Sequence, residues 1–146
     1  MQDPLEIEEV QENFHMGLIC AQQVFAHFAE RVGLPEETAL RIASPFGSGM
    51  GQGEVCGCVT GSLMVLGMLH GSGGPCSRPQ KDAFNARRNA FLQAFAKAHG
   101  GLRCSDLLGH DITTPEGMAA VRRENLFMTT CAPLVCAACA LLEEHL

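Results

Sequence analysis

Residues 46–69 read FGSGMGQGEVCGCVTGSLMVLGML and contain the pattern that decides the fold. Glycine stands at every second position from 47 to 53, so this part is predicted to be a loop. The following stretch, from Glu54 to Leu69, is rich in Val, Leu, Met and Gly and is too long for one strand. We therefore expect a buried helix that begins directly after a glycine-rich loop.

Apolar residues elsewhere recur at the three- and four-residue spacing of amphipathic helices. Glycine after residue 32 and after residue 99 marks the ends of two such segments, and Pro35 followed by two glutamates marks the start of another. The sequence thus predicts an all-α fold, a compact bundle of five to seven helices in one domain spanning residues 1–146. The expected helices cover residues 5–14, 18–32, 35–43, 54–69, 81–99, a segment from 114, and 127–143, with a single turn at 104–108.

The amino-acid composition argues against a nucleic-acid-binding function. The chain has 146 residues, of which 10 are basic and 16 are acidic, giving a formal net charge of −6. This acidic balance offers no basic surface for phosphate groups. The chain also has no Trp and no Tyr, and so lacks the usual aromatic platform for nucleic-acid bases. We expect no nucleic-acid partner.

The N-terminal segment MQDPLEIEE is acidic and lacks the basic and apolar regions of a secretory signal. The most apolar stretch, residues 55–69, is too short to span a bilayer. We therefore expect a cytoplasmic protein without a membrane span. In that compartment the eight cysteines would stay reduced, which favours metal binding or redox chemistry over structural disulfides.

The most informative cysteines are Cys56 and Cys58, because they open the expected buried helix directly after the glycine loop. A helix start stabilises a thiolate, so we expect a lowered pKa for Cys56. The residues alone leave two readings open: a site of reactive or metal-binding thiolates, or a glycine-rich contact at which another helix packs closely.

Several segments together resemble the redox-active protein family named for its C-GCAxxG-C-C cysteine pattern. These segments are ICAQQV (19–24), EETALRIA (36–43), FGSGMG (46–51), GEVCGCVTG (53–61), CSDLLG (104–109) and Cys131 ahead of Leu134. The resemblance implies that the four characteristic cysteines are Cys20, Cys56, Cys104 and Cys131. A related domain occurs in split-Soret cytochrome c, where it is associated with an iron–sulfur centre. Cys58 departs from the family, which usually has alanine at this position.

Taken with the resemblance, four thiolates delivered by different helices suit a [2Fe–2S] or [4Fe–4S] cluster, with Cys58 as a candidate additional ligand. The predicted role is electron transfer or redox sensing. The alternatives are a metal-free thiol–disulfide protein, a structural zinc site with four cysteines, and a plain structural domain. Zinc is less favoured because the four lack a close C-x₂₋₄-C pair. Roles for Cys76, Cys136 and Cys139 are not indicated.

Two partners are expected. The apolar segments 55–69 and 127–142 offer more surface than one small bundle readily covers, which predicts a homodimer. A redox role also requires a redox partner protein, whose identity the sequence does not reveal.

Overall fold

The computed structural model describes residues 2–146, which form eight α-helices and three short helical turns without a β-strand. The all-α prediction is confirmed, but the expected number of five to seven helices is too low. Residues 104–108, expected as a single turn, form a short α-helix of their own. The helices are α1 (Ile7–His15), α2 (Cys20–His27), α3 (Glu36–Ala43), α4 (Gly57–His70), α5 (Arg78–His99), α6 (Cys104–Leu108), α7 (Pro115–Arg123) and α8 (Ala132–Glu143). The turns are η1 (Ser44–Phe46), η2 (Gly49–Gly53) and η3 (Phe127–Cys131).

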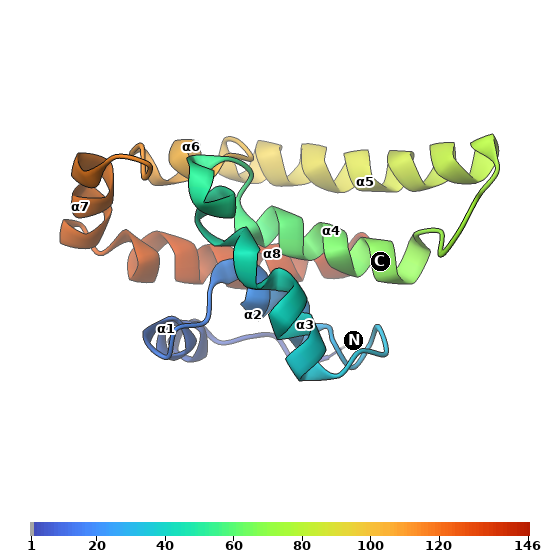
Figure 1. Ribbon diagram of the computed structural model, residues 1–146, viewed down its shortest axis with the longest axis horizontal. Helices are drawn as coiled ribbons and strands as arrows, with labels where there is room; N and C mark the ends of the chain where they lie inside the picture. Colours follow the sequence, from blue (N-terminus) through green and yellow to red (C-terminus); the bar gives the residue numbers. More distant parts are fainter. Residues whose placement is uncertain (1) are drawn as a thin grey trace.

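Helices α4, α5 and α8 run side by side and contact one another, while α1, α2 and α3 lie against one side of this group (Figure 1). Helix α2 packs against α4, α3 and α8 and so links the two parts. The chain leaves α5 and enters α6 near the end of the molecule at which α4 and α8 begin (Figure 1). Several helix starts are thereby gathered in one region.

The core is built from aromatic and branched side chains of these helices. Phe25 and Phe28 come from the α2 segment, Phe91 and Phe95 from α5, and Leu66 from α4, and all five are buried. Helix α4 is apolar around most of its circumference and is enclosed by α2, α5 and α8. The predicted buried helix after the glycine loop is therefore present.

Several helix boundaries differ from those expected: α5 begins at Arg78 rather than at residue 81, and α8 begins at Ala132 rather than at residue 127. Two others have a visible cause. Helix α4 begins at Gly57, three residues later than predicted, because Val55 is extended and pairs with Arg103 in an isolated antiparallel bridge. Helix α2 ends at His27, because Phe28 leaves helical geometry and the chain tightens into a turn.

Among the described residues, no single helix is long and apolar enough to cross a membrane. Residues 115–123 and 127–143 reach the required length and composition only as a pair bent by 68°. Six large apolar side chains are exposed: Ile7, Met16, Ile42, Met50, Met68 and Leu69. Most of α4 and α8 is covered by the chain itself, and the homodimer stays a prediction that light scattering would check.

Candidate thiol centre

Five of the eight cysteines lie at or beside the start of a helix. Cys20 is the first residue of α2, Cys56 precedes the first residue of α4, Cys58 is the second residue of α4, Cys104 is the first residue of α6, and Cys131 joins η3 to α8. Unpaired backbone N–H groups and the positive end of the helix dipole are found at helix starts. Such a position favours the ionised form of a thiol, except at Cys131, where η3 runs into α8 without a break in helical geometry.

Cys56 and Cys104 are brought together by the only β-type pairing in the described chain. Val55 and Arg103 form the antiparallel bridge. On either side of it, Cys56 N donates to Leu102 O at 2.7 Å and Cys104 N donates to Glu54 O at 2.6 Å. These two bonds hold the start of α4 beside the start of α6, although 48 residues separate the two cysteines along the chain.

Cys20 reaches the same region because residue 57 is glycine. A β-carbon at Gly57 would overlap Cys20 Sγ and would lie 2.9 Å from Ala21 N. One turn further along α4, a β-carbon at Gly61 would lie 2.9 Å from Ala21 O. The two glycines thus form the surface on which the start of α2 rests. The packing interpretation of this motif is confirmed at Gly57 and Gly61, where the start of α2 packs closely on α4. The interpretation as a site of reactive or metal-binding thiolates stays a prediction.

The glycine loop forms a left-handed turn next to Cys20. Ser48 and Met50 have φ values of 53° and 60°, a conformation that non-glycine residues adopt at a cost of about 1–2 kcal/mol. In this turn the backbone N–H of Ser48 hydrogen-bonds to Cys20 Sγ, together with the N–H of Ala21. The loop therefore supplies a hydrogen-bond donor to a sulfur atom.

Cys20 is the thiol of the centre whose pKa is lowered. Hydrogen bonds from the thiols of Cys56 and Cys58, followed by those from the Ala21 and Ser48 N–H groups, hold the pKa of Cys20 well below its usual value despite its burial among other groups. The expected lowering of the Cys56 pKa is wrong: the pKa of Cys56 is raised, because its thiol donates to Cys20 and would lie beside a second charge if ionised. The pKa of Cys58 is raised for the same reason.

The charge of Cys20 contributes to the raised pKa values of Cys104 and Cys131. Burial, with the Cys20 charge as the next cause, raises the pKa of Cys104 to about 11. Burial raises the pKa of Cys131 to about 12, with contributions from Cys20 and Cys104. The electrostatic coupling joins all five cysteines in one region, which we call the thiol centre.

The five thiols of the thiol centre are donors of the kind that a thiolate-bound metal cofactor requires. In the present side-chain arrangement, residues 2–146 contain no group of three or more His, Cys, Asp or Glu side chains set to hold a single metal ion. The assignment of Cys20, Cys56, Cys104 and Cys131 as ligands stays a prediction.

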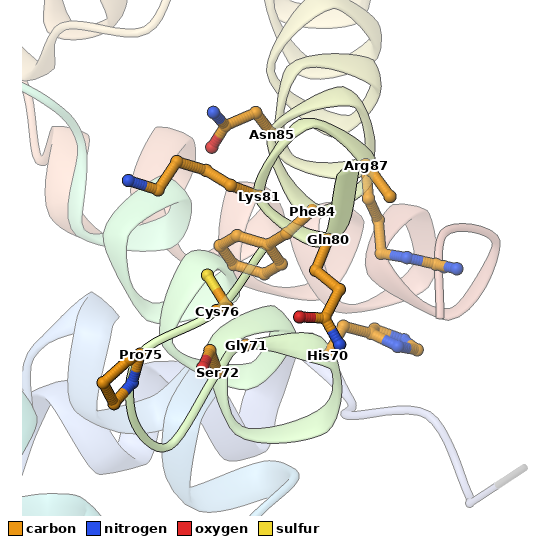
Figure 2. Close-up of a pocket in the computed structure, with 11 residues that line it drawn as sticks. His70, Gly71, Ser72, Pro75, Cys76, Gln80, Lys81, Phe84, Asn85 and Arg87 are labelled. Atoms are coloured by element: carbon orange, nitrogen blue, oxygen red, sulfur yellow. The ribbon is translucent and has the colours of Figure 1, made fainter. Parts of the chain in front are cut away.

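The other three cysteines lie elsewhere. Cys76 is in the exposed turn between α4 and α5, at the far end of α4 from Cys58. It lines a cavity of about 580 Å³ together with Gln80 and Phe84 (Figure 2). Cys136 and Cys139 lie within α8, and burial raises the pKa of both thiols, that of Cys139 to about 12. None of the three contributes to the thiol centre.

The Val55–Arg103 bridge was not predicted from the sequence, because a single pair of residues has no periodicity. The glycine loop was expected beside Cys56, and its Ser48 N–H acts on Cys20 instead.

The fold and the thiol centre define a helical, cysteine-rich redox protein. The family model described as "Putative redox-active protein (C_GCAxxG_C_C)" matches residues 18–145, and the chain belongs to this family. Comparison with curated proteins and with solved structures found no significant match.

Proposed function

We propose that the protein acts in electron transfer or redox sensing through an iron–sulfur cluster held by Cys20, Cys56, Cys104 and Cys131. This proposal is supported by the influence of Cys20 on thiols from three other segments, since it contributes to the raised pKa of Cys56, Cys104 and Cys131. Cysteine thiolates are the usual ligands of such clusters, and four of them complete the ligand set. A bound cluster supplies reversible one-electron transfer.

The chain's own residues would hold and tune this group. The Ala21 and Ser48 N–H groups donate to Cys20 Sγ, and donors to a ligand sulfur raise a cluster's reduction potential by stabilising the electron-rich state. Cys56 and Cys104 are 6% and 8% exposed, so water is largely excluded on their side. Cys20 and Cys131 are partly exposed, which leaves a route for electron exchange with a partner protein.

The experiment is metal and acid-labile sulfide analysis, with visible spectroscopy, on protein purified without oxygen. We expect iron and sulfide in equal amounts with broad visible absorbance in the wild type. The Cys56→Ser variant should lose both, whereas Cys76→Ser, the matched control, should keep both. Full iron loading in Cys56→Ser together with its loss in Cys58→Ala would assign the ligand to Cys58 instead. If the purified protein contains zinc but no acid-labile sulfide, the centre is a structural zinc site and not an iron–sulfur cluster.

A metal-free thiol–disulfide function is the second candidate, and the contact of Cys20 with two protonated thiols favours it. The Cys20 thiolate would attack a low-molecular-weight disulfide, forming a mixed disulfide and releasing one thiolate. Cys56 or Cys58 would then displace the second thiol and leave a protein disulfide with Cys20, so that two protein thiols are oxidised as one external disulfide is reduced. Metal-free protein whose alkylated mass changes by two thiols after reduction would support this function over the cluster.

A further inference from the structure

A second group of soft metal donors lies on α8, apart from the thiol centre. Cys136 and Cys139 are three residues apart on the helix, so their side chains are neighbours on one face. Both line a predominantly apolar cavity of about 290 Å³, which is closed on its other sides by His27 at the end of α2 and by the N-terminal residues Pro4 and Leu5. Glu143, one turn beyond Cys139, completes the polar part of its wall.

This cavity is separate from the thiol centre. Cys139 follows Cys131 by eight residues, which places it about 12 Å further along the helix axis. The charges acting on Cys136 are those of Glu6, Glu9 and Glu8, and those acting on Cys139 are Cys136 and Glu143. None of the five cysteines of the thiol centre shifts the pKa of Cys136 or Cys139. The two groups of cysteines can therefore bind metal independently.

The surroundings favour a positive ion over a free thiolate. The negative charges of Glu6 and Glu9 act on Cys136 and that of Glu143 acts on Cys139, and Glu143 also pairs with Arg31 at 2.7 Å. Two protonated thiols are neutral. Exchange of their two protons for one divalent cation leaves the total charge unchanged, which an apolar cavity tolerates better than a net charge.

His27 provides a third donor. Burial lowers the pKa of its imidazole, against the opposing effect of Glu143 and Glu9, so the ring is neutral at pH 7 and has a free lone pair. In the present side-chain arrangement the donors do not surround one point. Binding therefore requires a rearrangement of the side chains that line the cavity.

We propose that Cys136, Cys139 and His27 form a binding site for a soft divalent d¹⁰ cation, of the zinc and cadmium class. The two thiols each lose a proton to solvent, two metal–sulfur bonds and one metal–nitrogen bond form, and no group is oxidised or reduced. Thiolate and imidazole donors select such ions over magnesium or calcium, which prefer oxygen. Glu143 contributes negative charge to the wall of the cavity.

Cadmium is the probe, because its thiolate bonds absorb in the ultraviolet near 240–250 nm. Reduced full-length protein is equilibrated anaerobically with Cd(II) in the presence of a chelator that competes for it. Wild type and the Cys136→Ala/Cys139→Ala variant are compared for bound cadmium and thiolate absorbance, with Cys76→Ala as the matched single-thiol control. The double variant should bind one equivalent less than wild type, and the control should bind the same amount as wild type.

Two single variants test whether a loss of cadmium binding in the double variant is caused by misfolding. Cys136→Ser changes a partly exposed thiol, and His27→Gln removes the nitrogen donor while both thiols remain. Each should weaken the affinity for the last equivalent by about tenfold or more, with an unchanged far-ultraviolet circular dichroism spectrum. Equal cadmium binding by wild type and the double variant would overturn the proposal, as would an affinity unaffected by His27→Gln. Iron binding at the thiol centre is measured separately, and its outcome does not affect the interpretation of either cadmium experiment.

Discussion

The thiol centre and the Cys136–Cys139 pair contain the same type of side chain in opposite electrostatic settings. In the centre, helix starts and backbone N–H groups surround Cys20 with hydrogen-bond donors. Within α8, the N–H groups are already used by the helix, and the neighbouring charges are carboxylates. The difference shows that cysteine content alone does not determine the chemistry of a thiol; the groups that the fold places around each thiol do.

The largest expected difference concerns cluster loading. Cys20→Ser should abolish the iron and sulfide content of anaerobically purified protein, because it removes the thiolate on which the other four thiols converge. Cys136→Ser should leave the content unchanged. Iron and sulfide analysis of both variants measures the contrast, and comparable loss in the two would mean that the regions are not independent.

Thiol reactivity should differ next most strongly. In reduced, metal-free protein at pH 7, Cys20 should be alkylated at least a hundredfold faster than Cys136, because only a thiolate reacts and Cys20 is the ionised thiol. Both side chains are partly exposed, so accessibility does not explain the ratio. Mass spectrometry of peptides from a timed iodoacetamide reaction measures it. Equal rates would contradict the assignment of the charge to Cys20.

Disturbing the close packing of α2 on α4 should lower the stability of the protein measurably. Gly57→Ala should lower the free energy of unfolding by about 1–3 kcal/mol, because the added methyl group overlaps Cys20 Sγ. Gly67→Ala is the matched control on the same helix: nothing lies within 4 Å of its β-carbon, and alanine should raise stability by up to about 1 kcal/mol. Denaturant titration of both variants gives the comparison. A Gly57→Ala protein as stable as wild type would show that α2 does not rest on this surface.

The smallest effect is the pH dependence that the buried thiols impose. The pKa of Cys139 is about 12 in the folded chain, above the value of about 8.5 for an unfolded thiol. Its contribution to stability is present below about pH 8.5 and is lost as the pH rises towards 12, at up to about 1.4 kcal/mol per pH unit. Cys139→Ala should therefore flatten the decline of unfolding free energy between pH 9 and 10.

Cys76→Ala is the control for that measurement, because this thiol is exposed whether the chain is folded or unfolded. It should leave the slope with pH unchanged. A slope that is the same in wild type and Cys139→Ala would show that the Cys139 thiol does not stay protonated in the folded protein.

The sequence by itself determined the class of fold and the residues of the centre. Apolar residues spaced three and four apart, with Gly and Pro between the segments, predict helices because each helix repeats its contacts every turn. The resemblance to the family with the C-GCAxxG-C-C pattern implied Cys20, Cys56, Cys104 and Cys131 as the four characteristic cysteines, with Cys58 beside them. Predicted boundaries failed where a non-repeating contact intervened, as at Val55 and Arg103.

Only the tertiary structure decided which thiol carries the charge. Sequence reasoning assigned it to Cys56, because this residue opens a helix directly after the glycine loop. In the fold, Cys20 receives hydrogen bonds from Cys56, Cys58 and Ser48, which lie 28 to 38 residues away along the chain. A pKa is set by all groups within a few ångströms, whatever their separation in sequence, so it follows from how α2 packs on α4 and the glycine loop.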